Sequence, residues 1–341
     1  VDGSDPAWRA KKAEYSGDDK GLTDDSEERY RDLGIFKYWF RGVEKYAPWV
    51  RKVHILTEGH LPKWLDTTNP KLHIVRHSDI IPKDCLPTFN SNVIELYMYR
   101  IEGLSEHFVY FNDDMHIVNA VDRERFFKNG LPCDMLAFQP VIANPKNPVM
   151  SHTYMNNSIV ISGHFDKREN IKSQKGKYYN LKYPFMYLAY NLLELAFPQF
   201  TGFYTAHGPS PLLKSNYERL WAIEGELFEE MSKNRLRSER DISQYLFREW
   251  QKLTGEFVPT NVHKGYGYYE LSDDVSRLNA LIEELSCGKK QIICINDGAV
   301  SGNVEKISDR VCAAFEKRLR GGGETKERRF YEICEAGQHR R

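Results

Sequence analysis

The first half of the chain alternates between two patterns of apolar residues. From Leu33 to Tyr46 the apolar residues recur at spacings of three and four, which predicts an amphipathic helix that Pro48 brings to an end. A second helix is predicted over 92–99. Short apolar or β-branched runs predict strands at 53–57, 72–75 and 107–111. Strands that alternate with helices and connections are typical of an α/β fold with a mostly parallel sheet.

The second half of the chain is more helical. Apolar residues at helical spacing predict helices at 185–197, 211–233, 241–254, 274–286 and 304–319. Further strands are predicted at 135–138, 158–162 and 291–295. Two stretches rich in charged residues, 10–28 and 166–183, are predicted as loops. We therefore expect one α/β domain over 1–320, with a helical insertion or subdomain at about 166–290 and a flexible tail at 321–341.

Length and composition narrow the class of protein. The 341 residues are 41% hydrophobic and 13% aromatic, enough to bury one large core or two modest ones. The 48 basic residues balance the 48 acidic ones, which argues against nucleic acid as a partner. No apolar run approaches the roughly 20 residues of a membrane span.

The cysteines and the first residue bear on location. The six cysteines are scattered and form no CxxC pair, so the sequence indicates neither a zinc cluster nor a redox dithiol. Reduced thiols are typical of a cytoplasmic protein, which is the location we expect. The chain begins with Val1 rather than Met, which predicts that a further segment precedes it.

Acidic residues follow predicted strands at three places. They are Asp2 and Asp5 near the start, Asn112-Asp113-Asp114 after one strand, and Asn296-Asp297 after another. Open α/β sheets bind ligands at such strand ends, and we expect the three groups to converge there. Adjacent carboxylates such as Asp113 and Asp114 are typical ligands for Mg²⁺ or Mn²⁺ bridging to a phosphate. The alternative is that each group is an unrelated polar turn.

Four ordered groups of residues carry a family resemblance. The first is VDGSDP at 1–6, and the second and longest runs from Arg29 to His116, ending on YFNDDMH. The third joins AHGP at 206–209 and Lys214 to RSERDI at 237–242, and the fourth is ICIND at 293–297. This string resembles the motifs of the Stealth family, which includes bacterial capsule polysaccharide phosphotransferases and the animal GlcNAc-1-phosphotransferase α/β subunit. Gly298 stands where the family pattern has Asn or another polar residue.

The resemblance implies a Rossmann-like or glycosyltransferase-A-like fold, a UDP-sugar donor and dependence on a divalent cation. It implies that an acceptor hydroxyl attacks the phosphorus attached to the sugar, so that hexose 1-phosphate or hexosamine 1-phosphate is transferred and UMP is released. The acceptor would be a carbohydrate or polysaccharide, in capsule or cell-surface polysaccharide synthesis. Such an enzyme would be cytoplasmic, or peripheral at the inner face of the membrane beside the capsule export machinery.

The same motifs suggest roles for individual residues. Three are predicted to be catalytic: Glu95 as base or sugar-orienting group, Asp114 as metal ligand or base, and His207 as proton shuttle or phosphate ligand. Arginine and lysine suit diphosphate oxygens. The predicted donor-binding set is Asp5, Asn112, Asp113, Lys214, Arg237, Asn296 and Asp297, with Asp113 and Asp114 as metal ligands. The plainer reading of Glu95 is a solvated helix face, and that of Lys214 a surface charge.

Two other functions remain open from the sequence. A metal-dependent glycosyltransferase would use the same donor and similar carboxylates but would release UDP. A non-catalytic carbohydrate-binding module would stack sugars on aromatic residues such as Trp39, Trp49 and Trp64. Such a module would have no need for the ionisable residues Glu95, Asp114, His207 and Arg237. The presence of these four residues argues for an enzyme.

Overall fold

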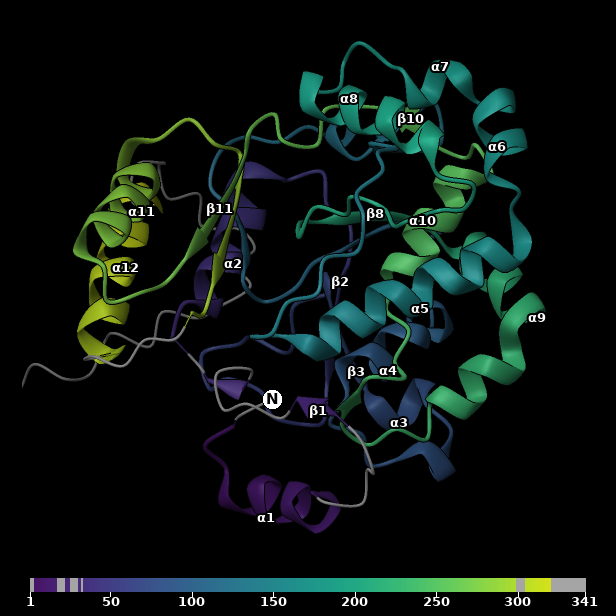
Figure 1. Ribbon diagram of the computed structural model, residues 1–341. Helices are drawn as coiled ribbons and strands as arrows, with labels where there is room; N and C mark the ends of the chain where they lie inside the picture. Colours follow the sequence, from purple (N-terminus) through teal and green to yellow (C-terminus); the bar gives the residue numbers. More distant parts are fainter. Residues whose placement is uncertain (1–2, 17–21, 25–29, 32, 299–303, 320–341) are drawn as a thin grey trace, which may run out of the picture.

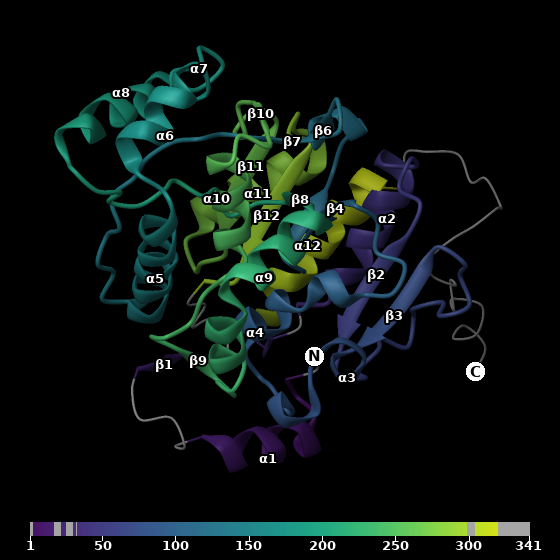
Figure 2. The same ribbon diagram turned by 90° about the vertical axis from the view of Figure 1, so that its right-hand side faces the viewer.

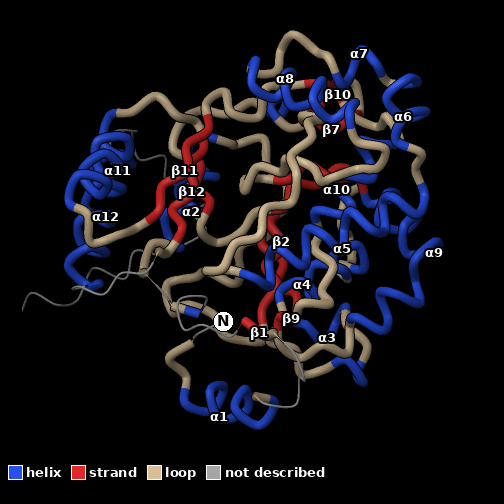
Figure 3. Tube along the Cα trace, in the orientation of Figure 1, coloured by secondary structure: helices blue, strands red, loops and turns tan. Residues whose placement is uncertain are grey.

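The protein is seen in a computed structural model that describes residues 3–16, 22–24, 30–31, 33–298 and 304–319. The predicted tail at 321–341 and the first two residues lie outside the described residues. Figure 3 shows helices spread over the whole trace and strands in several short groups. The α/β class predicted from the sequence is confirmed at this level.

The helices are distributed along the whole chain. They are α1 Pro6–Tyr15, α2 Phe36–Tyr46, α3 His77–Ile80, α4 Ser91–Leu96, α5 Pro148–His164, α6 Lys167–Ser173, α7 Lys175–Tyr178, α8 Phe185–Leu193, α9 Lys214–Met231, α10 Tyr245–Leu253, α11 Val275–Cys287 and α12 Val304–Leu319. Within the described ranges they are extended or connected by the short 3₁₀ helices η2 Lys83–Cys85, η3 Met98–Arg100, η4 Arg123–Arg125 and η5 Glu194–Ala196.

The strands are short and pair in small groups. They are β1 Thr23–Asp24, β2 Val53–Thr57, β3 Leu72–Arg76, β4 His107–Tyr110, β5 Met115–Ile117, β6 Phe127–Lys128, β7 Leu131–Asp134, β8 Ser210–Leu213, β9 Arg237–Ser238, β10 Val258–Pro259, β11 Tyr266–Glu270 and β12 Ile292–Asn296. The pairs β2–β3, β11–β12 and β10–β7 are parallel. The pairs β4–β8, β12–β5, β6–β7 and β1–β9 are antiparallel.

These pairings do not make the mostly parallel Rossmann-like sheet that we expected. Among the described residues the strands fall into groups of two or three. The reason lies after β4, where only the turn Phe111–Asp114 leads into β5. A parallel crossover needs a dozen or more residues, so β5 leaves β4 and pairs antiparallel with β12 instead.

Four local predictions were wrong. Residues 158–162 lie inside α5, because Asn147 accepts a hydrogen bond from Met150 N and Pro148 occupies the first turn, so the helix runs through the β-branched stretch. The predicted loop at 166–183 contains α6 and α7. The one at 10–28 begins within α1 and includes β1, while its residues 17–21 and 25–28 lie outside the described residues. Residues 135–138 form no strand beyond one bridge from Phe138 to Phe203.

The two largest of the apolar cores hold most of the elements in place. The larger one gathers side chains of α4, α5, α9, α10 and β8, and the other packs α11 and α12 against β12 and α2. Figure 1 shows α11 and α12 on one side of the molecule and α5, α9 and α10 on the other. Tyr38 of α2 stacks on Phe315 of α12 at 4.7 Å between ring centroids. Within the described ranges, no helix combines the length and apolar character needed to cross a bilayer.

The region predicted as a helical insertion, 166–290, holds the helices α6 to α11. It also contributes strands, because β8 pairs with β4 and β11 pairs with β12. The β8 pairing ends beside the polar turn that follows β4, and β12, which β11 supports from its other side, contacts that turn through Ile295 N and Asp114 O. Residues of the second half therefore complete the part of the fold that carries the acidic strand ends.

Candidate functional site

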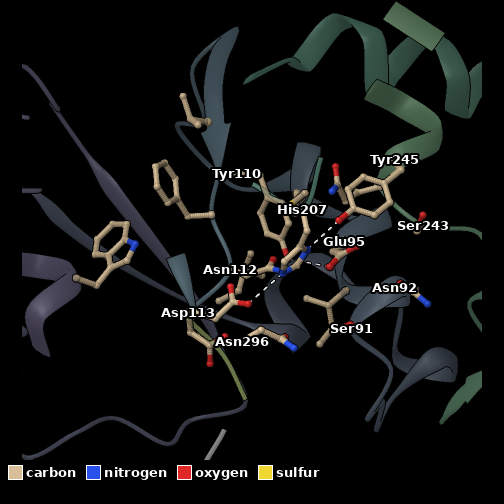
Figure 4. Close-up of a pocket in the computed structure, with 18 of the residues that line it drawn as sticks. Ser91, Asn92, Glu95, Tyr110, Asn112, Asp113, His207, Ser243, Tyr245 and Asn296 are labelled. Carbon is tan, nitrogen blue, oxygen red and sulfur yellow. Dashed lines mark hydrogen bonds and ion pairs between the residues drawn. The ribbon is translucent and has the colours of Figure 1, made fainter. Parts of the chain in front are cut away.

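A single large cleft brings most of the predicted site residues together. Its volume is about 3470 Å³. Eight of the ten predicted residues line it: Glu95, Asn112, Asp113, Asp114, His207, Arg237, Asn296 and Asp297. Figure 4 shows Glu95, His207 and Tyr245 close to one another, with Asn112 and Asn296 nearby. The cleft is larger than the roughly 300–1,000 Å³ of a typical small-molecule pocket, so it has room for two substrates.

The acidic strand ends converge through antiparallel pairing. Tyr110, at the end of β4, lies opposite Ser210 at the start of β8, which places His207 beside the turn Asn112–Asp114. On the other side of the turn, Ile295 N of β12 donates to Asp114 O at 2.8 Å. The turn is therefore held between β8 and the end of β12, which continues into Asn296 and Asp297.

Asp114 and His207 form the centre of the site. His207 Nε2 lies 3.0 Å from Asp114 Oδ2, and His207 Nδ1 lies 3.0 Å from the Tyr245 hydroxyl. The Tyr266 hydroxyl donates to His207 O and holds the loop that carries the ring. Both ring nitrogens thus have partners, which orients the imidazole toward the carboxylate. His207 is placed to stabilise the charge of Asp114.

Cys294 of β12 completes this cluster. Its Sγ lies 3.1 Å from Asp114 Oδ2, and the three residues Asp114, His207 and Cys294 offer ligand atoms within 4.8 Å of one another. Burial and the adjacent Asp114 carboxylate raise the pKa of the Cys294 thiol, so the thiol stays protonated and donates to Asp114. Asp114 Oδ2 therefore accepts from two donors.

Glu95 is a buried carboxylate rather than a solvated one. It lies on α4, whose first turn is capped by Asn90, and its Oε1 accepts from the Tyr110 hydroxyl at 2.8 Å. Burial raises the pKa of Glu95, while Arg237, the Tyr110 bond and a bond from the Gln244 N–H partly oppose that rise. A carboxylate whose pKa is raised toward neutrality is suited to accept a proton from a hydroxyl.

Arg237 reaches the cleft from β9. Its Nη2 donates to Ser91 Oγ at the start of α4, so Arg237 and Glu95 are held by the same short helix. The link is reinforced by Asp241, which is fully buried. Asp241 accepts from Asn90 Nδ2 at 2.8 Å, from Asn92 Nδ2 at 2.9 Å and from Asn234 Nδ2 at 2.9 Å. This network ties the start of α4 to the segment that carries Arg237.

Two predicted donor-binding residues do not line the cleft. Asp5 caps α1 by accepting from Ala7 N at 3.1 Å, and its other oxygen lies 3.0 Å from His60 Nε2. Its carboxylate serves that cap, although its neighbour Ser4 does line the cleft. Lys214 follows β8, and its backbone N–H donates to Glu106 O. Glu106 precedes β4, so Lys214 lies at the end of that strand that is farther from Asp114. Its ammonium lies 3.9 Å from Glu218.

The oxygen atoms near the turn fit a hard divalent cation. Asn112 Oδ1 and Asp114 Oδ1 are buried, and neither accepts a hydrogen bond from any described residue. Oxygen ligands of this kind are those that Mg²⁺ and Mn²⁺ prefer. Asp113 is exposed beside them and lines the same cleft. The remaining oxygen of Asp114 is already occupied by His207 and Cys294.

At the end of β12, the departure from the family pattern has a steric reason. A Cβ at Gly298 would overlap the backbone oxygen of Leu271, so only glycine fits without a shift of the backbone. The neighbouring Asp297 carboxylate lies 3.5 Å from Arg31 Nε.

Sequence reasoning missed four residues of the site. Tyr110, Tyr245, Cys294 and Asp241 hold the four predicted ionisable groups, yet each resembles an ordinary core or turn residue in the sequence. Tyr110, Cys294 and Asp241 lie inside the groups of residues that resemble the family motifs, and that position was the available signal. Tyr245 carried none, because its role depends on the fold bringing α10 to His207.

Comparison with known proteins supports the family resemblance that the sequence motifs show. Residues 29–134 match the family described as Stealth protein CR2, conserved region 2. The chain is 40% identical over 320 residues to a capsular polysaccharide phosphotransferase WcwK of Streptococcus pneumoniae, covering 94% of this chain and 93% of the relative. It is 38% identical to the receptor polysaccharide phosphotransferase WefC of Streptococcus gordonii, covering 94% of each.

A third relative comes from another genus. The chain is 36% identical to the exopolysaccharide phosphotransferase cps2G of Lactiplantibacillus plantarum, with 94% of this chain and 92% of the relative covered. The matched lengths include the four predicted ionisable residues of the site, from Glu95 to Arg237, rather than one motif alone. The chain therefore belongs to the Stealth family, as an enzyme of the polysaccharide phosphotransferase group within it.

Proposed function

We propose that the protein transfers hexose 1-phosphate or hexosamine 1-phosphate from a UDP-sugar to a hydroxyl of a carbohydrate acceptor, in capsule or cell-surface polysaccharide synthesis. The observation that carries the proposal is the convergence of Glu95, Asp114, His207 and Arg237 on one cleft. The relatives' names, which specify polysaccharide phosphotransferases, support the reaction class.

The reaction balances with the residues present. The acceptor oxygen forms a bond to the phosphorus that carries the sugar, and the phosphorus–oxygen bond to UMP breaks. Glu95 accepts the proton of the attacking hydroxyl, while Tyr110 holds its carboxylate in place. Arg237 binds diphosphate oxygens through its guanidinium. Because the sugar–oxygen bond is untouched, the product is a phosphodiester.

Asn112, Asp113 and Asp114 would hold a divalent cation, Mg²⁺ or Mn²⁺. When bound, the cation supplies positive charge that neutralises the diphosphate oxygens. The protein's part is to fix the oxygen ligands, and it does so by holding Asp114 through His207 and Cys294. The spare Oδ1 of Asp114 is left for that ligand.

A product analysis tests the proposal. The purified protein would be incubated with a panel of UDP-sugars, Mg²⁺ or Mn²⁺ and polysaccharide fragments, with EDTA in a parallel reaction. We expect UMP in stoichiometric amount with a phosphodiester signal in ³¹P spectra, and no turnover with EDTA. Arg237→Ala should raise KM for the donor or abolish turnover. Lys214→Ala is the matched control, because Lys214 lies outside the cleft, and it should remain active.

Other products would identify the rival functions. Release of UDP, with a glycosidic bond in the product, would establish a glycosyltransferase instead. Oligosaccharide binding without turnover for any donor would indicate a carbohydrate-binding module. A nucleotide-sugar donor is supplied in the cytoplasm, so we place the protein there or at the inner face of the membrane, beside the capsule export machinery.

A further inference from the structure

An unusual concentration of exposed apolar side chains lies between residues 181 and 197. Leu181 is 91% exposed and Phe185 is 84% exposed. Five more large apolar residues of this stretch are also exposed: Met186, Leu192, Leu193, Leu195 and Phe197. Exposed apolar residues are ordinary when scattered, but a contiguous group marks an interaction surface.

Helix α8 is apolar on its outer face. Tyr187 and Asn191, four residues apart, are buried against the protein, and Asn191 Nδ2 donates to Leu136 O at 3.0 Å and to Tyr178 O. Phe185, Met186 and Leu193 point away from this contact and are exposed. An amphipathic surface helix normally presents polar residues on its outer face. The outer face of α8 is therefore built for an apolar environment.

A buried ion pair keeps the exposed residues in position. Lys167 Nζ lies 2.7 Å from Glu194 Oε2, and both side chains are buried. The same ammonium donates to Glu194 O at 2.8 Å, to Phe197 O at 3.2 Å and to Gln199 O at 2.9 Å. The turn after α8 is thus fixed by four bonds from one lysine, so Leu195 and Phe197 are displayed by a rigid scaffold.

The surrounding segment is basic. Residues 166–197, which we call the docking segment, contain six basic and three acidic residues, although the whole chain is balanced. Arg168, Lys172, Lys175 and Lys182 are exposed, as are the acids Asp166 and Glu169, whereas Glu194 is buried in the ion pair, so the exposed charge of the segment is positive. Figure 2 shows α6, α7 and α8 projecting together from the rest of the molecule. Exposed apolar residues with flanking cations match the chemistry of an anionic membrane surface.

The docking segment is linked to the rim of the cleft. Directly after Phe197, the chain returns along the cleft, where Val141 N donates to Thr201 O at 3.0 Å and Gln139 N to Gly202 O at 3.3 Å. Gln139 and Val141 line the cleft. A membrane held by the docking segment would therefore lie close to the entrance through which an acceptor arrives.

We propose that the docking segment binds the surface of an anionic lipid bilayer, with the outer face of α8 and the turn after it inserted at the interface. The exposed lysines and arginine contact the lipid headgroups, and the apolar side chains enter the acyl boundary. That this contact presents the cleft to a membrane-attached acceptor rests on the proposed function; the docking itself does not.

Vesicle flotation with the full chain tests the docking. Binding would be measured to vesicles of phosphatidylglycerol mixed with phosphatidylcholine, and to phosphatidylcholine alone. We expect binding to the anionic vesicles that weakens in 0.5 M salt. The double variant F185S/L193S should lose about tenfold or more in partitioning, since two apolar side chains no longer leave water. The double variant K172Q/K175Q should lose about fivefold for each cation.

Matched controls separate the surface from general effects. Val275, at the start of α11, is 63% exposed, and Val275→Ser should bind vesicles like the unmodified protein. Lys264 and Lys289 are exposed outside the docking segment, so K264Q/K289Q is the control for charge. All variants should keep the unmodified melting temperature, because each altered side chain is exposed.

Two results would overturn the proposal. One is flotation that is equal for F185S/L193S and V275S. The other is absence of vesicle binding together with a concentration-dependent dimer that F185S/L193S abolishes in sedimentation equilibrium, which would make the surface a self-association site. Activity on a soluble acceptor should be unchanged in F185S/L193S, so a failed transfer reaction and a failed docking are seen in separate measurements.

Discussion

Two aspartates of the same chain are held in contrasting ways. Asp134 is buried, and its oxygens accept from Arg248 Nε at 2.6 Å, Arg248 Nη2 at 2.9 Å and Met135 N at 2.7 Å. Asp114 accepts from His207 and Cys294 on one oxygen, while its buried Oδ1 has no hydrogen-bond donor among the described residues.

The difference separates stabilising polar groups from functional ones. A buried carboxylate costs free energy unless its oxygens are satisfied, and Asp134 meets that condition within the protein. Asp114 meets it only in part, because its Oδ1 has no donor among the described residues, and this oxygen is the ligand atom that we propose for the cation. Asp241, with four donors, belongs with Asp134, although it lies in the motif that carries Arg237.

The largest expected effect is on activity at Asp114. Asp114→Asn keeps the shape of the side chain but removes its charge, so kcat/KM should fall about 10³-fold or more. The melting temperature should change little or rise, because the variant removes a partly buried charge that has too few hydrogen-bond donors. Asp122→Asn is the control, since Asp122 is exposed and outside the cleft. If Asp114→Asn retained a tenth of the activity, Asp114 would not be the functional carboxylate that distinguishes it from Asp134.

The opposite pattern is expected at Asp134. Arg248→Met leaves a buried carboxylate without its partner and should lower the free energy of unfolding by about 3–5 kcal/mol. Urea denaturation measures it. The control is Arg219→Met, which breaks an ion pair of 2.7 Å to Glu256 at the surface and should cost no more than about 1 kcal/mol. Equal losses in the two variants would show that Asp134 is not a stabilising group.

The stability that the pair Asp134 and Arg248 contributes should depend on pH in the acidic range. Burial alone would raise the pKa of Asp134, but the charges of Arg248 and Lys252 outweigh it and hold that pKa below its ordinary value. Stability from Asp134 is therefore present above the unfolded-state pKa of about 3.9 and is lost as the pH falls through the lower folded-state pKa. Arg248→Met should reduce this acid dependence in the denaturation series.

The smallest expected effect concerns Glu95. Because burial raises its pKa and a base must be ionised, kcat/KM should rise with pH through that raised pKa. Tyr110→Phe removes a hydrogen bond that favours the carboxylate, so the acidic limb of the pH profile should move to higher pH. The rate on the plateau should stay close to that of the unmodified enzyme. A limb that stays in place, or moves to lower pH, would exclude Glu95 as the base.

Local sequence patterns were sufficient to predict those helices and strands that need only an apolar surface to pack against. The helices at α2, α11 and α12 and the strands β2, β3 and β12 follow from apolar periodicity, because each presents one apolar face to whatever core covers it. Where a distant residue decided the outcome, periodicity failed. The β-branched residues 159–161 became helix because Asn147 and Pro148 start a helix that continues through them.

The site shows the same division between sequence and structure. Sequence alone determined the available chemistry and the family, because the types and order of residues are properties of the chain. Eight of the ten site residues that it predicted line the cleft. Only the tertiary structure decided which of them meet. Asp114 and His207 are 93 positions apart, and they meet because β4 pairs with β8 rather than through the expected parallel sheet. Which carboxylate is saturated and which is left for a ligand depends on such long-range pairing, and no local pattern encodes it.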